Sequence, residues 1–441
     1  MNNEKEIPTL LQLNDDCLYS IFNKLSIKEQ LQLANTCERF RFIITQMIWR
    51  TQFQETRTIG ADTDELNNQE YQELFHHIVE HMEKFTIADN KHLVFSSYLG
   101  RYAHRPELAF YLCTHFPRLI SFECLDQRLH DGLLRLIVKN CPKLQVLKAT
   151  SDYITGAHIK DMHNLRELYL PDCSLSSEHL NDIFKHLNLT HLDIAGSKLQ
   201  AIPFNEHSFS KLRYLKLSEN QIEAGFVENC NYFQNLECLT VTHLEQEEAL
   251  YVPWQGLFEK LGYRVAKLKI YNAQDAYAML AFTANTSKLS ALETIFIKGQ
   301  LNERYLNGFA LLPALKEFQQ YSYAHIRPTT ILNFISRSKC LQRLHLICCD
   351  QLFDMQLHWL LDIIEVLRKQ KARSTFCLNF VHSDLLYFEN HIRKIKRQVI
   401  EDARYTSQSL LKITFNKPPI KYTPTFDQYI QMYFNNNSNS I

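Results

Sequence analysis

Histidines are the residues whose spacing first suggests chemistry in this chain. His77 and His81 lie four residues apart in a segment with helical periodicity, a spacing that can bind zinc. No further cluster of metal-ligating residues accompanies them, and exposed histidine pairs are usually solvated, so we predict no metal site. His191 and Asp193 would share one face of a strand, but no serine or cysteine nucleophile is in register beside them. We interpret them as surface contacts.

The sequence lacks the motifs of the common enzyme classes. It contains no HExxH, P-loop, nucleophile elbow or dinucleotide-binding fingerprint. Ten glycines are few for 441 residues, which argues against glycine-rich phosphate loops. The 12 cysteines form no CxxC pair, and we interpret them as reduced thiols of a cytosolic or nuclear protein. We therefore predict that the chain is not an enzyme and holds no cofactor.

Charge and hydropathy narrow the classes of partner. The chain has 48 basic and 48 acidic residues, so it has no overall charge that would favour nucleic acid or a membrane surface. Its first residues are polar and lack an apolar signal core. No run of about 18 uncharged apolar residues is present. These features predict a cytoplasmic and/or nuclear protein that binds neither nucleic acid nor a membrane.

One short phrase recurs along the middle of the chain. Asn164–Cys173 reads NLRELYLPDC, Asn188–Ser197 reads NLTHLDIAGS, and Lys211–Asn220 reads KLRYLKLSEN. Apolar residues occupy relative positions 1, 4 and 6, and Cys, Ser or Asn occupies position 9. Positions 4 and 6 are two residues apart, so both point to the same side of a short strand. This is the pattern of the leucine-rich repeat.

The phrase extends in both directions and gives ten repeats. They start at Leu119, Leu144, Leu165, Leu189, Leu212, Leu236, Val265, Leu292, Leu315 and Leu341. The ninth is weak, because Gln320 stands where an apolar residue belongs. We also weigh an ordinary doubly wound sheet, but its units take about 30 residues or more and do not repeat one phrase. Two further strands are predicted at Thr375–Phe380 and Leu410–Phe415. The chain therefore predicts an α/β fold, a curved leucine-rich-repeat solenoid with a parallel concave sheet.

The first 53 residues follow a different pattern. Leu18, Ile21, Phe22 and Leu25 form one helical stripe that begins near Asp15 or Asp16. A second stripe joins Leu33, Cys37 and Phe40 after Ser26, and a third apolar run ends at Trp49. Three short helices of this length barely bury a core alone. We expect such a module to gain stability from a partner, although it could also be a simple cap on the solenoid.

This segment resembles the F-box. The matching residues are Leu13, Asp16, Leu18, Ile21, Phe22, Leu25, Leu31, Leu33, Ala34, Cys37, Arg39, Phe40, Trp49 and Arg50. Asn14 departs from the family, which usually has proline there. The resemblance implies a contact with a Skp-family adaptor through Leu13, Leu18, Ile21, Phe22, Leu25, Leu31, Leu33, Cys37, Phe40 and Trp49. An F-box followed by leucine-rich repeats is the architecture of substrate receptors of SCF-type ubiquitin ligases.

Three functions remain open from the sequence. The resemblance implies a substrate-recognition subunit, reaching cullin and RING subunits through the adaptor, that brings a protein to ubiquitination and proteasomal degradation. A protein that binds the adaptor without promoting degradation is a second possibility. A plain leucine-rich-repeat scaffold or inhibitor is the third.

The substrate would meet positions 3, 5 and 7 of each phrase, because these alternate with the buried positions. The predicted contacts are Tyr169, Tyr214, Lys216, Lys267, Lys269, Tyr271, Phe296, Lys298, Arg343 and His345. Glu317 is the only acid among these positions in the later repeats. We therefore expect repeats seven to ten to bind an acidic or phosphorylated segment, although a solvated patch balanced elsewhere would look the same.

The predicted domain order follows. Residues 1–53 form the F-box, 54–115 a helical linker and N-terminal cap, 116–415 the solenoid, and 416–441 a polar tail that we expect to be disordered. Within the linker, apolar residues from Tyr71 to Met82 recur at helical spacing. A basic cluster at Arg393–Arg397 is either a solvated helix face or a nuclear-import signal.

Overall fold

The computed structural model of the chain forms two compact units, residues 1–212 and 213–441. It describes residues 10–55, 57–59, 66–79, 82–87, 115–124, 129–199, 202–203, 209–222, 224–242, 254–271, 286–298, 303–321, 327–347, 357–370, 375–381 and 411–416. The basic cluster at 393–397, His81 and the tail beyond 416 lie outside these ranges. Among the described residues, no helix combines the length and apolar character that crossing a lipid bilayer requires.

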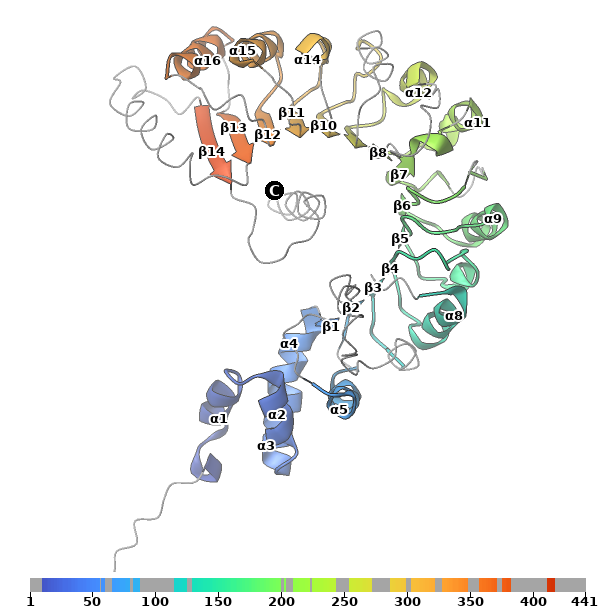
Figure 1. Cartoon of the computed structure of the whole chain (residues 1–441), viewed down its shortest axis with the longest axis vertical. Coiled ribbons are helices and arrows are strands. Elements are labelled where there is room, and N and C mark those ends of the chain that lie inside the picture. Colours follow the sequence, from blue (N-terminus) through green and yellow to red (C-terminus); the bar gives the residue numbers. More distant parts are fainter. Residues whose placement is uncertain are drawn as a thin grey trace, which may run out of the picture. The chain divides into compact units, whose positions relative to one another are not determined.

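The first unit begins with a group of short helices (Figure 1). They are η1 (Leu10–Gln12), α1 (Asp15–Phe22), α2 (Ile27–Ala34), α3 (Glu38–Phe42), the π-helical segment η2 (Ile43–Trp49) and α4 (Arg50–Glu55). The last three follow one another without a break, so they act as one long third helix. Three helical segments were predicted here, and the structure has three after the short turn η1.

Capping residues set where these helices begin. Asn14, rather than Asp15 or Asp16, caps α1, and its side chain accepts a hydrogen bond from the Cys17 amide. Ser26 caps α2 as predicted, in a capping box closed by Glu29. The predicted stripe through Cys37 is not one helix, because α2 ends before Cys37, which is the N-cap of α3.

Six parallel strands form the sheet of the first unit. They are β1 (Arg57–Ile59), β2 (Lys84–Ile87), β3 (Ser121–Cys124), β4 (Val146–Ala149), β5 (Glu167–Tyr169) and β6 (His191–Asp193), each paired with the next. The register places Leu147 opposite Leu168 and Leu168 opposite Leu192. The residues at position 4 of the repeat phrases in the first unit are therefore aligned with one another across the sheet.

Helices α5, α8 and α9 accompany these strands. α5 (Asn68–Ile78) lies between β1 and β2 in the sequence, α8 (Asp131–Asn140) follows β3, and α9 (Ser177–His186) follows β5; the short turn η4 (Ile159–Asp161) follows β4. α5 confirms the helix predicted from the apolar periodicity that starts at Tyr71, but it ends at Ile78, so Met82 lies outside it. The two strands β1 and β2 were not predicted, because their residues do not carry the repeat phrase.

The second unit continues the pattern with eight parallel strands. They are β7 (Tyr214–Ser218), β8 (Cys238–Thr242), β9 (Lys267–Tyr271), β10 (Thr294–Lys298), β11 (Glu317–Tyr321), β12 (Arg343–Ile347), β13 (Phe376–Val381) and β14 (Leu411–Asn416). The accompanying helices are α11 (Ala224–Glu228), α12 (Trp254–Leu261), α14 (Glu303–Phe309), α15 (Pro328–Arg337) and α16 (Leu357–Lys369), with short turns η5 (Glu219–Gln221) and η6 (Cys230–Tyr232). All ten predicted repeats contain a strand, and the two later strands are confirmed.

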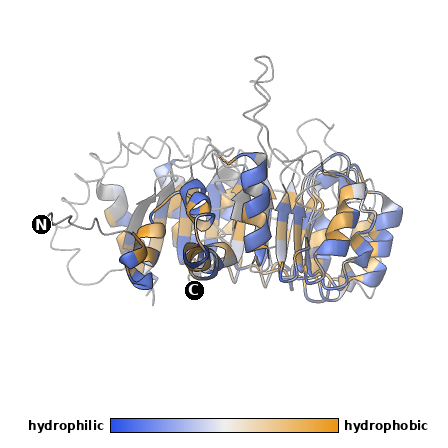
Figure 2. Cartoon of the chain, turned by 90° about the horizontal axis from the view of Figure 1, so that it is seen from below, coloured by the Kyte–Doolittle hydropathy of each residue, from blue (hydrophilic) through white to orange (hydrophobic). Residues whose placement is uncertain are grey.

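In each unit the helices after the strands lie on one side of the sheet (Figure 1). Positions 4 and 6 of the phrase face these helices and are buried, as at Leu215 and Leu217. The helices carry a hydrophobic and a hydrophilic side, which Figure 2 shows as orange and blue faces. The core is therefore the layer between strands and helices, and we name the opposite side of the strands the open face.

The inward leucines should dominate stability. Leu192 and Leu215 are 0% and 1% exposed, so Leu192→Ala or Leu215→Ala should each cost about 2–5 kcal/mol in the free energy of unfolding. Leu311→Ala is the matched control, because Leu311 is 63% exposed and its truncation should cost little. Urea denaturation measures all three. If Leu311→Ala and Leu215→Ala lower the free energy of unfolding equally, the strand register is wrong.

Candidate functional site

A buried glutamine joins the three helical segments of residues 10–55. The Gln30 side-chain amide donates to the carbonyl oxygens of Phe22 (2.9 Å) and Leu25 (3.2 Å), at the end of α1. Its carbonyl oxygen accepts from the Trp49 indole at 2.6 Å. Because Gln30 and Trp49 are both buried, an unpaired group here would be costly. This residue therefore fixes how α1, α2 and η2 meet.

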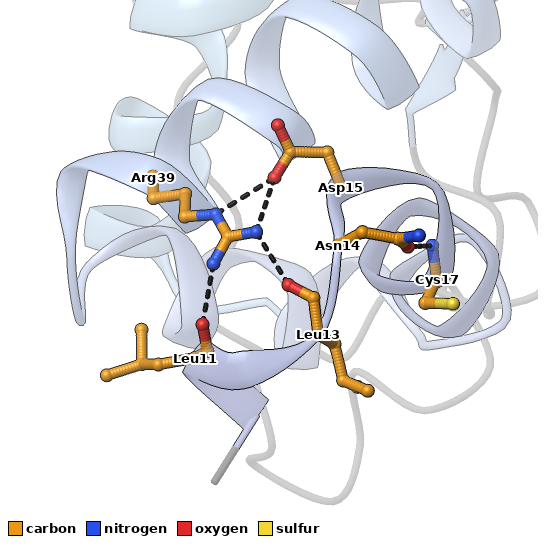
Figure 3. A network of polar contacts seen from close by, with 6 residues as sticks. All are labelled: Leu11, Leu13, Asn14, Asp15, Cys17 and Arg39. Carbon is orange, nitrogen blue, oxygen red and sulfur yellow. Dashed lines mark hydrogen bonds and ion pairs between the residues drawn. The ribbon is translucent and has the colours of Figure 1, made fainter.

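A second network holds the segment that precedes α1 (Figure 3). The Arg39 guanidinium contacts Asp15 Oδ1 through Nε (2.9 Å) and Nη2 (2.7 Å). It also donates to the carbonyl oxygens of Leu11 at 2.8 Å and Leu13 at 2.6 Å. Four charge-assisted bonds from one side chain position the backbone of residues 11–15 against α3.

Asn14, which stands where the F-box pattern has proline, gives the backbone before α1 a conformation similar to that of proline. Asn14 has a φ of −71°, close to the value that a proline ring imposes. Its Oδ1 accepts from the Cys17 amide at 2.9 Å, which proline could not provide. The departure from the F-box pattern therefore exchanges ring rigidity for a capping hydrogen bond.

The predicted adaptor contacts divide into two groups. Leu18, Phe22, Leu31, Phe40 and Trp49 are core residues with little or no exposed surface. Leu13, Ile21, Leu25, Leu33 and Cys37 remain accessible, and Ile21 is 40% exposed. The sequence reading missed three exposed apolar side chains in the same segment, Leu10, Leu11 and Phe42. Their exposure could not be read from helical periodicity, which marks apolar residues as buried.

These helices are not separate from the rest of the first unit. The Asn35 amide on α2 donates to Glu73 Oε2 on α5 at 3.1 Å, and the Trp49 ring lies 6.1 Å from the His77 ring. Burial lowers the pKa of His77, and the positive charges of His76 and Arg41 act in the same direction. α5 therefore completes the core of the N-terminal helices.

The open face of the second unit carries a concentration of positive charge. It is formed by the residues in register with Tyr214, Lys216 and Ser218 of β7. Its described charged and titratable side chains, cysteine and tyrosine aside, are Lys216, Lys267, Lys269, Lys298, Glu317, Arg343, His345 and Lys412. Six lysines and arginines thus face one carboxylate, in a chain whose overall charge is zero.

Lys267 and Lys269 lie on β9, and their register partners on the two neighbouring strands are uncharged. On β8 their register partners are Cys238 and Thr240, and on β10 Lys267 is opposite Thr294. Two carboxylates at position 2 of neighbouring phrases, Glu237 and Glu293, have cationic partners. Arg213 binds Glu237 at 2.8 Å, and Lys316 binds Glu293 at 2.6 Å. Among the described strands, Lys267 and Lys269 therefore have no acidic register partner.

Glu317 forms a different environment on β11 and β12. Its Oε2 lies 2.8 Å from Arg343 Nη2, its Oε1 lies 3.2 Å from His345 Nε2, and Gln319 also donates to it. Burial raises the pKa of this carboxyl, but the hydrogen bonds and the charges of His345 and Arg343 outweigh that effect and hold it at about 2. Arg343 and His345 are thus balanced within the protein.

Several predicted substrate contacts differ from expectation. Phe296 is 2% exposed and its ring packs 5.0 Å from that of Tyr271, while Lys216 is only 9% exposed. Lys298 lies 5.5 Å above the ring of Tyr321. The remaining predicted residues of this face are at least partly accessible.

Tyr169 belongs to the first unit, as do His191 and Asp193. Tyr169 donates to Glu167 at 2.9 Å, and its pKa is raised, first by burial and then by the Glu167 charge. His191 lies 3.8 Å from Glu167, and Asp193 accepts from the Ala195 amide at 3.1 Å. These contacts stabilise the strand ends. Within the described residues, no group of three or more His, Cys, Asp or Glu is placed to hold a metal ion.

The Glu317 cluster predicts a specific acid sensitivity. A carboxyl whose pKa falls from 4.5 to about 2 on folding stabilises the fold above pH 4.5 and loses that contribution as the pH falls towards 2. The contribution is at most about 3 kcal/mol. Glu317→Gln should therefore lower the free energy of unfolding at pH 7. The difference in this free energy between the variant and the unmodified chain should become smaller by pH 3. Urea denaturation measures both. The variant Glu365→Gln should show a much weaker trend, because the hydrogen bond from Lys369 also lowers the pKa of Glu365 but solvent screens this exposed pair.

Comparison with known proteins agrees with the geometry of the N-terminal helices. Residues 10–51 match the F-box domain. No curated protein matches the chain by sequence. Among solved structures, a leucine-rich-repeat protein of Leptospira interrogans is similar at 12% identity, over 64% of this chain and 86% of that chain, with a TM-score of 0.24.

That TM-score is low, so the repeat assignment depends on the phrase and the strand register of this chain. The phrase predicted ten strands, and each lies in the expected row of a parallel sheet. The chain is thus an F-box and leucine-rich-repeat protein, with the F-box domain at residues 10–51 and the repeat strands after it.

Proposed function

We propose that the chain is the substrate-recognition subunit of an SCF-type ubiquitin ligase. The observation that carries this proposal is the F-box domain at residues 10–51 in the same chain as an open, charged sheet face. F-box domains bind Skp-type adaptors, which connect them to a cullin, a RING subunit and a ubiquitin-loaded conjugating enzyme. The repeat strands would hold the protein that receives ubiquitin.

This function needs no catalytic group from the chain itself. Holding a substrate lysine near the ubiquitin thioester raises its effective concentration, which makes the transfer effectively intramolecular. The requirements on this chain are two stable surfaces, one for the adaptor and one for the substrate. The Gln30 and Arg39 networks give the first surface a fixed shape.

The substrate surface that fits best is the open face of β9 and β10. Lys267 and Lys269 lie two residues apart on one strand, so their side chains emerge on the same side, about 7 Å apart at their Cα atoms. Their register partners on β8 and β10 are uncharged, so no described register partner balances this positive charge. We infer that an acidic or phosphorylated segment of the substrate binds here through charge-assisted hydrogen bonds.

Adaptor binding should depend on the accessible apolar residues of the F-box. Ile21→Glu places a charge in the exposed part of α1, and it should reduce adaptor binding by at least about tenfold, because a charge buried at an interface is costly. Co-purification and titration with a recombinant Skp-family adaptor measure the change. A point variant is sharper than deletion of residues 1–53, which would strip α5 of its packing partners.

The matched control is Tyr153→Glu, which adds the same charge to another exposed large side chain of the first unit. It should leave adaptor binding unchanged, and both variants should keep the melting temperature. Adaptor binding that survives Ile21→Glu at full strength would move the adaptor surface away from α1.

Substrate capture should depend on the paired lysines. Lys267→Glu with Lys269→Glu reverses the local charge and should remove the captured proteins while adaptor binding persists, because the adaptor surface lies in the other unit. Proteins retained from native cells, identified by mass spectrometry with and without proteasome inhibition, provide the readout. A rise in their abundance on inhibition tests the degradative step.

Lys211→Glu with Lys339→Glu is the control, because it makes the same charge change at two exposed positions away from β9. It should retain the captured proteins. If both pairs lose them equally, net charge rather than the β9 surface governs capture.

A further inference from the structure

Glu317 stands in the row of residues that an acidic segment would follow along the open face. The row at position 3 of the repeats contains Lys267, Thr294, Glu317 and Arg343 on successive strands. Adjacent strands lie about 4.8 Å apart, so Glu317 is about 10 Å from Lys267, measured between Cα atoms. An extended acidic segment that starts at β9 and crosses the strands therefore meets this carboxylate after two steps.

The Glu317 carboxylate contacts two side chains of β12, Arg343 and His345. Glu317 is 13% exposed, whereas the Arg343 side chain beside it is 42% exposed. Both carboxylate oxygens are engaged, Oε2 by Arg343 and Oε1 by His345 and Gln319. Asn379 contacts the other ring nitrogen of His345 at 3.1 Å and so supports the cluster from β13. The guanidinium is accessible to a partner, but its charge is already matched.

We propose that Glu317 is a specificity-determining residue that confines anion binding on the open face to β9 and β10. The Glu317 carboxylate acts as an internal competitor for Arg343. An acidic ligand must displace this carboxylate to reach Arg343, and otherwise it is repelled by the negative charge of Glu317. The inference rests on the proposed anionic ligand of this face. It adds that the face is divided, with a receptive part at Lys267 and Lys269 and a part closed to acids at Arg343 and His345.

A fluorescein-labelled deca-glutamate peptide is a suitable probe, because extended it spans about 33 Å and can cross from β9 to β12. Its affinity for the full chain is measured by fluorescence anisotropy at low ionic strength. Glu317→Gln should tighten binding by about fivefold or more, since one further charge-assisted hydrogen bond becomes available at Arg343. Circular dichroism and the melting temperature confirm that the variant is folded at the temperature used.

Glu293→Gln is the matched control. It removes a carboxylate from another cation pair one row away, the pair with Lys316, and changes the net charge by the same amount. It should change the affinity by less than about twofold, because Glu293 is not in the row that the probe follows. The double variant Glu317→Gln with Arg343→Gln removes the released cation as well, and should return the affinity to that of the unmodified chain.

The outcomes separate this inference from the proposed function. Three results would overturn the role of Glu317. The probe could bind Glu317→Gln and the unmodified chain with equal affinity, or its affinity could rise equally in Glu317→Gln and Glu293→Gln. The third result is a higher affinity that persists in the double variant. Undiminished probe binding by Lys267→Glu with Lys269→Glu would instead contradict the proposed location of the anionic ligand. A gain that appears in Glu317→Gln alone and vanishes with Arg343 supports the division of the face.

Discussion

Parallel register is the constraint on which the rest of this structure depends. Side chains alternate across a strand, so a slip of one residue would exchange the buried leucines for the charged open-face residues. Leu215, Leu239 and Leu268 stand opposite one another on β7, β8 and β9, and each is buried. The same register sets Lys267 and Lys269 on the opposite side. Core packing and the arrangement of the partner surface are therefore two results of one alignment.

The alignment also distributes charge. Acids at position 2, such as Glu237 and Glu293, find arginine or lysine on the neighbouring repeat and form exposed pairs. Pairs of this kind contribute little to stability, but they remove negative charge from the edge of the open face. A chain with no net charge can in this way present a strongly positive surface on a few strands. Under the proposed function, local rather than overall charge would select its partners.

Sequence reasoning succeeded where one residue type repeats for one physical reason. The leucine phrase predicted ten strands and their buried side, because only apolar residues can fill the layer under the helices. It could not predict β1, where Arg57 stands in the row that leucine or phenylalanine occupies elsewhere. It also missed the burial of Phe296 and the balance of Arg343 by Glu317, because both depend on neighbours from other repeats. Asn14 illustrates a third case, in which a different residue provides a similar backbone with another bond.

The contacts of α5 determine how the helices of the F-box and the first strands of the first unit can move relative to each other. One side of this helix meets α2 and Trp49, and its Phe75 ring lies 6.3 Å from Phe116, just before β3. The F-box and the first strands therefore both pack against α5. The F-box should accordingly resist transplantation onto other repeat scaffolds unless α5 travels with it.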